Sequence, residues 1–324
     1  MTPSISIVVC CYNMARELPL TIHSLSPPLQ RGVQVSDYEI IVVDNGSTER
    51  FDENQCRQWG ADLRVLRIAP AAASRSPVRA INAGIAQARG RLIGVMVDGA
   101  RLASPGLVAS AAMADKTADR AVILTLGFHL GPGVQMESVP QGYNQEQEDR
   151  LLAQARWAED GYRLFDISVF GGSSSNGWFG PIAESNAVFM RRPLWDELGG
   201  FDEKFQEPGG GLVNLDTLAR AVALPEVAVV TLLGEATFHQ IHGGAATNAI
   251  TDPWDAFHAE YVRIRGHAFQ MPAYRTLYFG SVPVNALGSI YESTRKALAL
   301  YSSKQDQKPL ERSRLFRKRR KRLA

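Results

Sequence analysis

Three side chains that could bind a ligand stand at the ends of short apolar runs of the sequence. Tyr12 follows the first run, Asp44 ends the second, and Asp98 ends a third that is rich in aliphatic residues. Runs of this length are too short for most helices and predict buried strands. In open α/β sheets ligands bind at the carboxyl ends of the strands, so the three side chains are candidates for one site.

These side chains suit the recognition of a flat group that can form hydrogen bonds. An aromatic ring offers a stacking surface, and a carboxylate accepts hydrogen bonds or holds a hard cation. Each residue also has a structural alternative. Tyr12 could be a core aromatic, Asp44 could form a turn with the residues that follow it, and Asp98 could cap the turn it makes with Gly99.

The elements that would carry these residues alternate between strands and helices. Apolar runs predict strands at 4–11, 38–43, 63–68, 91–98 and 120–127, and helical spacing predicts helices at 15–26, 51–59, 78–88 and 105–114. This alternation predicts an α/β fold with a mostly parallel central sheet, built from right-handed crossovers and flanked by helices.

The regular pattern fades between residues 128 and 181. This segment is rich in Gly, Pro, Ser and Gln and contains one predicted helix, at 148–159. Loops of such length in a compact domain usually either bind a ligand or are disordered. Regular elements then return, as strands predicted at 185–190, 227–233 and 236–240 and helices at 193–198, 254–265 and 287–301.

Length and composition place limits on the class of protein. The chain has 324 residues, enough for one large α/β domain with appendages. Its three cysteines, Cys10, Cys11 and Cys56, show no disulfide or zinc spacing, which favours a reducing cytoplasm. No segment has the pattern of a signal peptide, and no run approaches the roughly 20 apolar residues of a membrane span.

The charge is unevenly distributed. The whole chain has a formal net charge of +2, yet residues 312–324 alone hold eight basic residues and no acidic one, so the rest of the chain is net acidic. Such a tail binds anionic lipid headgroups, which predicts peripheral contact with a membrane; a solvated tail is the alternative. We expect no nucleic-acid binding, because no nucleic-acid-binding fold or motif is apparent.

Several segments, in their order and spacing, resemble the inverting nucleotide-sugar glycosyltransferases of family 2, which have the GT-A fold. They include Ile-Val-Val-Cys-Cys-Tyr-Asn, Glu-Ile-Ile-Val-Val-Asp-Asn-Gly-Ser-Thr, Arg-Ala-Ile-Asn-Ala-Gly and Val-Asp. These segments and two later ones lie at 7–13, 39–48, 79–84, 97–98, 198–203 and 216–220. The resemblance spans roughly residues 4 to 245 and implies a GT-A domain.

The resemblance assigns roles to the candidate residues. It implies that Tyr12 and Asp44 hold the nucleoside of a UDP-sugar donor and that Arg79 pairs with a phosphate; a solvated surface arginine is the alternative for Arg79. It also implies a divalent cation, Mn²⁺ or Mg²⁺, bound by Asp98 and by His242, which follows a predicted strand together with His239. Mn²⁺ suits a mixed carboxylate and imidazole site better than Mg²⁺ does.

Two departures from the family pattern fall on catalytic positions. Ala100 stands where the Asp-x-Asp metal motif has its second acid, and Asn214 stands where relatives carry the carboxylate base. Asp216 is the predicted substitute for that base, with a helix N-terminal acid as its alternative role. The sequence thus leaves open an active inverting transferase or a degenerate nucleotide-sugar-binding or scaffold protein.

The predicted organisation is one GT-A domain with a C-terminal extension. Residues 1–250 form the domain, with a nucleotide-binding half at 1–127 and an acceptor half at 128–250. A helical region at 251–311 covers the acceptor half or pairs with a second subunit in a homodimer, and the basic tail occupies 312–324. The predicted acceptor is a carbohydrate or a lipid-linked molecule. The predicted location is the cytoplasm, at the inner face of the membrane.

Overall fold

One mixed sheet forms the centre of the molecule. The computed structural model describes residues 3–243 and 253–306. Within these, a ten-stranded sheet has the order β10-β9-β6-β8-β4-β1-β2-β3, with β5 paired to β9 and β7 to β6. The strands are β1 Ile5–Cys11, β2 Tyr38–Asp44, β3 Leu63–Arg67, β4 Leu92–Met96, β5 Arg101–Ala103, β6 Ala121–Leu130, β7 Ser168–Phe170, β8 Ala187–Arg191, β9 Ala228–His239 and β10 Thr276–Gly280.

Most neighbouring strands are parallel. β4, β1, β2 and β3 form one parallel set, and β6, β9 and β10 form another. β8 lies between the two sets and is antiparallel to both β4 and β6. The carboxyl ends of β1, β2 and β4 therefore meet at one edge of the sheet, and the amino end of β8 lies at that same edge.

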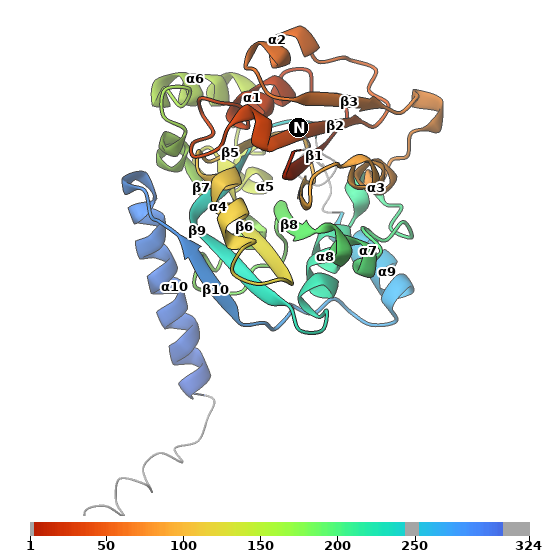
Figure 1. Ribbon diagram of the computed structural model, residues 1–324. Helices are drawn as coiled ribbons and strands as arrows, with labels where there is room; N and C mark the ends of the chain where they lie inside the picture. The colour runs from red at the N-terminus through yellow and green to blue at the C-terminus, as the bar shows by residue number, and fades with distance from the viewer. Residues whose placement is uncertain (1–2, 244–252, 307–324) are drawn as a thin grey trace, which may run out of the picture.

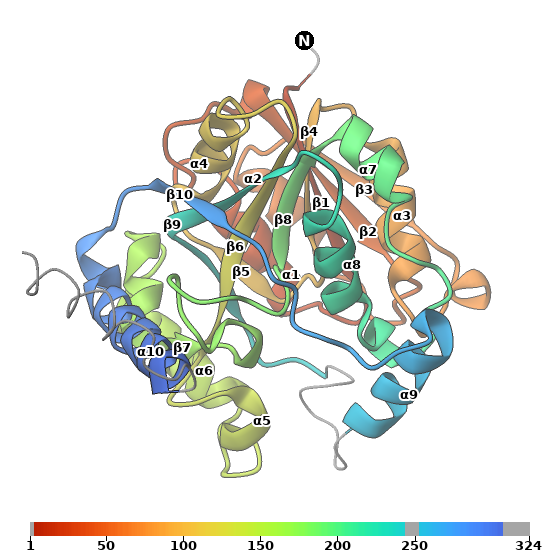
Figure 2. The same ribbon diagram turned by 90° about the horizontal axis from the view of Figure 1, so that it is seen from below.

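Helices cover both faces of the sheet (Figures 1 and 2). α1, α2 and α4 pack on one face, and α3, α7 and α8 pack on the other. The helices are α1 Glu17–Ser24, α2 Glu53–Gln58, α3 Val78–Gln87, α4 Leu107–Ala114, α5 Gln135–Ser138, α6 Gln145–Ala155, α7 Arg192–Leu198, α8 Val213–Val222, α9 Trp254–Arg265 and α10 Leu287–Asp306. None of the described helices is long and apolar enough to cross a bilayer.

The apolar runs of the sequence supply two cores, one on each face of the sheet. Successive side chains of a strand point to opposite faces. In β1, Ile7 and Val9 therefore pack with the helices of one face, whereas Val8 and Cys10 pack with those of the other. All seven residues of β1 are buried, as expected for a strand covered on both sides. The α/β fold with a mostly parallel sheet is confirmed.

Asn82 and Gly84, in the motif at 79–84, hold α3 in place. A Cβ at Gly84 would lie 2.4 Å from Cγ1 of Val8, so only glycine lets α3 approach β1 this closely. Asn82 exchanges two hydrogen bonds with the backbone of Phe201, at 2.9 and 3.0 Å. Two segments of the resemblance, at 79–84 and 198–203, are thus joined to each other.

The structure differs from the sequence prediction in several elements. The strands predicted at 227–233 and 236–240 are one continuous strand, β9, whose pairing with β6 shifts register between Leu124 and Leu126. The C-terminal region is not purely helical, because β10 adds an edge strand to the sheet. The helix predicted at 148–159 begins earlier, at Gln145. The basic tail at 312–324 lies outside the described residues.

Candidate functional site

Tyr12 and Asp44 lie side by side at the carboxyl edge of the sheet. β1 and β2 are paired in register, with Cys11 opposite Asp44, so Tyr12 emerges directly beside that acid. Tyr12 is 54% exposed, which excludes the role of a core aromatic. An exposed ring at this edge is free to stack on a flat ligand.

Asn13 fixes the two loops that follow these strands. It adopts a left-handed backbone conformation with φ 52°. Its Oδ1 accepts hydrogen bonds from the backbone N–H of Thr48 at 2.8 Å and of Glu49 at 3.2 Å, and its own N–H donates to Ser47 Oγ at 2.8 Å. Asparagine tolerates this conformation better than most residues. The sequence analysis predicted no role for Asn13. In the structure, the contacts of Asn13 fix the backbone next to Tyr12.

Asp44 takes part in a turn and also faces the edge of the sheet. Its Oδ1 accepts a hydrogen bond from the N–H of Ser47 at 2.8 Å, so the turn-forming role is realised. Its Oδ2 lies 4.0 Å from Nε of Arg67. The Asp44 residue is only 4% exposed, so little of its surface is open to a ligand.

Asp98 lies just beyond β4 at the same edge, and it too contacts the local backbone. Its Oδ1 accepts a hydrogen bond from the N–H of Ala100 at 3.0 Å, as expected for a turn cap. Its Oδ2 accepts one from Nε of Arg101 at 2.8 Å. Arg101 is 7% exposed, so this ion pair is largely shielded from water.

Two histidines from the end of β9 approach the same carboxylate. One ligand atom from each of Asp98, His239 and His242 lies within 4.8 Å of the others. The Nε2 atoms of the two histidines are 3.0 Å apart, and Nε2 of His239 is 3.9 Å from Oδ2 of Asp98. The structure brings His242, the predicted ligand, to Asp98 and adds His239 as a second candidate ligand.

Gln135 determines which nitrogen of His239 is available. The Gln135 side-chain amide donates to the carbonyl of His239 at 3.0 Å, and its Oε1 lies 2.6 Å from Nδ1 of the same residue. Because Oε1 can only accept, Nδ1 of His239 must carry the proton, which leaves Nε2 with a lone pair directed at Asp98 and His242. Orientation of a histidine by a partner on its other nitrogen is typical of metal sites.

The protonation states match this interpretation. Burial lowers the pKa of His239 well below its ordinary value, and Arg101 lowers it further. Burial also lowers the pKa of His242, against the opposing effect of Asp98. For Asp98, burial favours a higher pKa, but Arg101 and His242 outweigh it and the pKa is lowered. One carboxylate and two neutral imidazoles are a donor set that fits a divalent cation.

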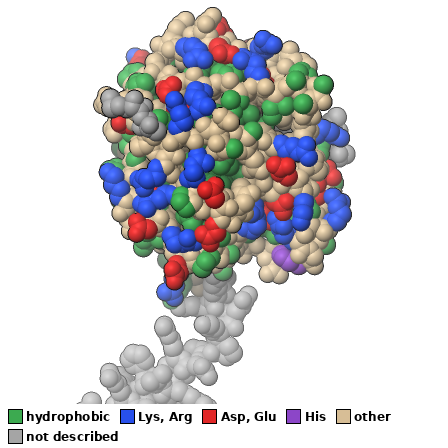
Figure 3. Space-filling view, turned by 45° about the vertical axis from the view of Figure 1, so that its right-hand side comes forward, with side chains coloured by type: hydrophobic (Ala, Val, Ile, Leu, Met, Phe, Trp, Pro, Cys, Tyr) green, Lys and Arg blue, Asp and Glu red, His purple; other side chains and the backbone are tan. Residues whose placement is uncertain are grey.

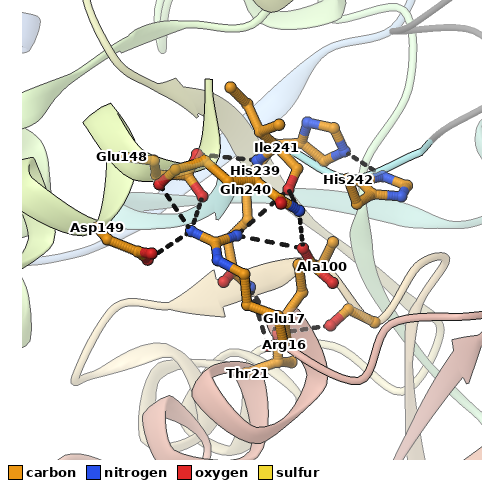
Figure 4. Close-up of polar contacts among 12 residues, drawn as sticks. Arg16, Glu17, Thr21, Ala100, Glu148, Asp149, His239, Gln240, Ile241 and His242 are labelled. Atoms are coloured by element: carbon orange, nitrogen blue, oxygen red, sulfur yellow. Dashed lines mark hydrogen bonds and ion pairs between the residues drawn. The ribbon is translucent and has the colours of Figure 1, made fainter. Parts of the chain in front are cut away.

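The segment that carries His242 is held from two sides (Figure 4). Oε2 of Glu148, in α6, accepts the N–H of Ile241 at 2.8 Å, and Arg16 bridges Oε1 of Glu148 and the carbonyl of Ile241. On the opposite side the N–H of Gln240 donates to the carbonyl of Ala100 at 2.8 Å. α6, which lies in the region between residues 128 and 181, therefore supports the segment that carries His242.

Arg79 lies in the first turn of α3 and is directed toward solvent. Its side chain is 67% exposed, and its Nε lies 3.4 Å from Oε2 of Glu203. Such an exposed pair contributes little to stability and leaves the guanidinium able to change partner. Basic and acidic side chains are interspersed on the face of the molecule drawn in Figure 3. The phosphate role of Arg79 stays a prediction.

Comparison with known proteins tests the resemblance. Residues 6–102 match the model of the family described as glycosyl transferase family 2. Residues 6–102 belong to glycosyl transferase family 2. The matched segment contains four of the candidate ligand-binding residues, Tyr12, Asp44, Arg79 and Asp98, and it ends before the residues that would hold the acceptor. No curated protein sequence matches the chain.

Solved structures of glycosyltransferases are similar to this chain at low sequence identity. TarS 1–349 from S. aureus in complex with UDP-GlcNAc is 15% identical with a TM-score of 0.48, over 80% of this chain and 66% of that chain. TarS 1–349 itself is 15% identical with a TM-score of 0.47, over 73% and 60%. Mannosyltransferase PcManGT from Pyrobaculum calidifontis, in complex with GDP-Man and Mn²⁺, is 16% identical with a TM-score of 0.46, over 98% and 79%. The chain thus spans about three fifths of the length of TarS 1–349.

Asp216, the predicted base, is not presented to a substrate. It is 1% exposed in the first turn of α8. Both of its oxygens are engaged: Arg265 contacts Oδ1 at 2.6 Å and Oδ2 at 2.7 Å, and Arg220 contacts Oδ2 at 2.7 Å. A carboxylate that is buried and held by two guanidiniums is not accessible to an acceptor hydroxyl. We therefore replace this prediction: Asp216 joins α9 to α8.

Proposed function

We propose that the chain transfers a sugar from a UDP-sugar to a carbohydrate or lipid-linked acceptor, with inversion at the anomeric carbon, in the synthesis of a surface polysaccharide or glycolipid. The observation that carries the proposal is the meeting of Tyr12, Asp44 and Asp98 at one edge of the sheet within a family 2 segment. These groups suit an aromatic base, its hydrogen-bonding edge and a charged diphosphate.

The proposed roles follow from the contacts of each residue. Tyr12 stacks on uracil, and Asp44 accepts a hydrogen bond from its edge. Asp98, His239 and His242 would hold a divalent cation, and Mn²⁺ fits two imidazoles better than Mg²⁺ does. When bound, this cation would neutralise the charge that develops on the departing diphosphate. Gln135 orients His239 toward the cation.

We further propose that the protein works in the cytoplasm and contacts the inner face of the membrane through residues 312–324. Eight basic residues there favour anionic headgroups, each by about 1 kcal/mol near the surface. Sedimentation with vesicles that contain an anionic phospholipid tests this. Loss of binding after deletion of 312–324 is the expected result, and unchanged binding would contradict the proposal.

A second function has specific support: a nucleotide-sugar-binding protein without turnover. Ala100 supplies no second carboxylate, Asn214 supplies no base, and Arg101 already pairs with Asp98 at 2.8 Å. Bound cation must compete with this guanidinium for the carboxylate. A protein that had lost transfer would keep the nucleoside contacts of Tyr12 and Asp44, because these do not depend on the cation.

Hydrolysis of UDP-sugars with and without Mn²⁺ separates the two functions. The transferase predicts turnover that requires the cation and that Asp98→Ala abolishes. Asp119→Ala is the matched control, because that side chain is 99% exposed and lies away from the sheet edge. Tight UDP binding by calorimetry with no turnover of any UDP-sugar would instead support the binding protein.

A further inference from the structure

The segment that leads into β8 brings a carboxylate to the edge of the sheet where Asp98 lies. β8 runs antiparallel to β4, with Ala187 opposite Met96. Residues that precede Ala187 therefore lie beside residues that follow Met96. Glu184 precedes the strand by three residues and Asp98 follows Met96 by two, so both acids belong to the same rim.

Side chains that contact the two acids come together beside Gly127. Oε1 of Glu184 accepts a hydrogen bond from Nδ2 of Asn186 at 3.2 Å. That amide nitrogen lies 3.3 Å from the point where a Cβ on Gly127 would stand, and Nη1 of Arg101 lies 3.7 Å from the same point. Arg101 in turn holds Asp98 through Nε. The amide that contacts Glu184 and the guanidinium that contacts Asp98 thus both lie next to Gly127.

The backbone on both sides of Glu184 is fixed. The N–H of Ala183 donates to the carbonyl of Ser173 at 2.9 Å. Oγ of Ser185 accepts the N–H of Thr125 at 2.9 Å and lies 3.0 Å from the carbonyl of the same residue. Glu184 itself is half-buried, and no basic side chain among residues 3–243 and 253–302 forms an ion pair with it. A carboxylate with one amide donor keeps lone pairs that can accept a proton.

Other acidic side chains near the rim are engaged by other residues. Asp216 is held by two arginines. Glu17 and Glu148 are 3% and 0% exposed and both contact Arg16. Asp98 lies beside His239 and His242 in the proposed cation site. Of these carboxylates at or near the rim, Glu184 combines partial exposure with freedom from a cationic partner.

We propose that Glu184 is the general base of the transfer, in place of the carboxylate that Asn214 lacks. This inference rests on the proposed function. The acceptor O–H gives its proton to the Glu184 carboxylate as the oxygen forms a bond to the anomeric carbon of the donor. The bond from that carbon to the diphosphate oxygen breaks, and its electron pair leaves with UDP.

Azide provides a test specific to a base, because an anionic nucleophile has no proton to lose. The enzyme is assayed with UDP-glucose, UDP-galactose and UDP-N-acetylglucosamine, first with water and then with sodium azide as the acceptor. Glu184→Gln removes the base and keeps the side-chain size. Glu146→Gln is the matched control, since the Glu146 side chain is 80% exposed and its ion pair is with Arg150 on the same helix.

We expect Glu184→Gln to slow hydrolysis by a factor of about 10²–10⁴ while the rate of glycosyl azide formation changes less than about threefold. The pH profile of hydrolysis should lose its acidic limb in this variant, and UDP affinity by calorimetry, which also reports folding, should not change. Glu184→Asp should recover part of the hydrolysis rate, because it restores a carboxylate.

Three outcomes would overturn the assignment. Equal losses with water and azide would mean that Glu184 positions the donor. Hydrolysis at the wild-type rate in Glu184→Gln would refute the base while leaving the transferase intact. Absence of turnover by the wild-type protein with every donor and both nucleophiles would refute the proposed function, and the base assignment with it.

Discussion

Replacement of Asp216 tests whether this acid holds the fold together or performs chemistry. The carboxylate is almost fully buried and contacts Arg265 twice and Arg220 once, at 2.6 to 2.7 Å. Removing one partner of a buried ion pair costs about 3–5 kcal/mol, because the remaining charge is left without compensation. The Arg265 and Arg220 side chains are 20% and 26% exposed and can recover some water. We therefore expect a loss nearer ~2–4 kcal/mol for Asp216→Ala.

Unfolding in urea, followed by tryptophan fluorescence, measures this loss. At a slope of about 3 kcal/mol per M the midpoint should fall by roughly 1 M. The double variant Asp216→Ala with Arg265→Ala should lose less than the sum of the single variants, because the uncompensated Arg265 charge is gone. Arg263→Ala is the control, since that side chain is 69% exposed on the same helix.

A catalytic base would behave differently. Asp216→Asn would then keep the stability of the wild-type protein and reduce kcat by a factor of about 10² or more. Our interpretation predicts the reverse: reduced stability, and turnover within a few-fold of wild type at a temperature where the variant is folded. Full stability together with lost turnover would refute it.

Three further predictions address the rim and its support. Tyr12→Ala should weaken UDP binding by about 1–3 kcal/mol, as for loss of base stacking, with no change in stability; calorimetry measures this, and unchanged affinity would exclude stacking. His239→Ala should abolish binding of Mn²⁺ at neutral pH, measured by electron paramagnetic resonance, whereas His258→Ala on α9 should not. Burial raises the pKa of Glu148 to about 7. The folded state therefore holds this proton more tightly than the unfolded chain, so the free energy of unfolding should fall as the pH rises from about 4.5 to 7. Glu148→Gln should remove that dependence, and a curve identical to wild type would contradict the shift.

The sequence predicted the nucleotide half of the fold because its signals are local. β1, β2 and β4 are largely apolar runs, and a polar residue at or just after the end of each marks the edge of the sheet. Parallel neighbours align these ends without further information, so Tyr12, Asp44 and Asp98 could be placed at one edge from pattern alone. The match to family 2 covers the same stretch, residues 6–102.

The prediction was weakest where elements depend on distant partners. β5 has three residues and β10 has two strongly exposed apolar side chains, Leu277 and Tyr278, so neither shows the pattern of a buried strand. Asp216 looked like a free acid at a helix start because its principal partner, Arg265, stands 49 positions later. Contacts of this kind arise from tertiary packing and leave no periodic signal.

The cluster of Asp98, His239 and His242 also combines a local sequence signal with contacts that arise only from tertiary packing. An Asp-x-Asp motif would have its second acid two residues after Asp98, but this position is Ala100. Ala100 is 0% exposed, and its carbonyl accepts a hydrogen bond from the N–H of Gln240. That bond continues the antiparallel pairing of β5 with β9, in which Arg101 stands opposite His239. The pairing carries His239 and, three residues on, His242 to the carboxylate of Asp98. A cross-strand contact would thus supply nitrogen ligands where the local motif lacks an oxygen, and this exchange of donor type is the physical reason to propose Mn²⁺ rather than Mg²⁺ for this site.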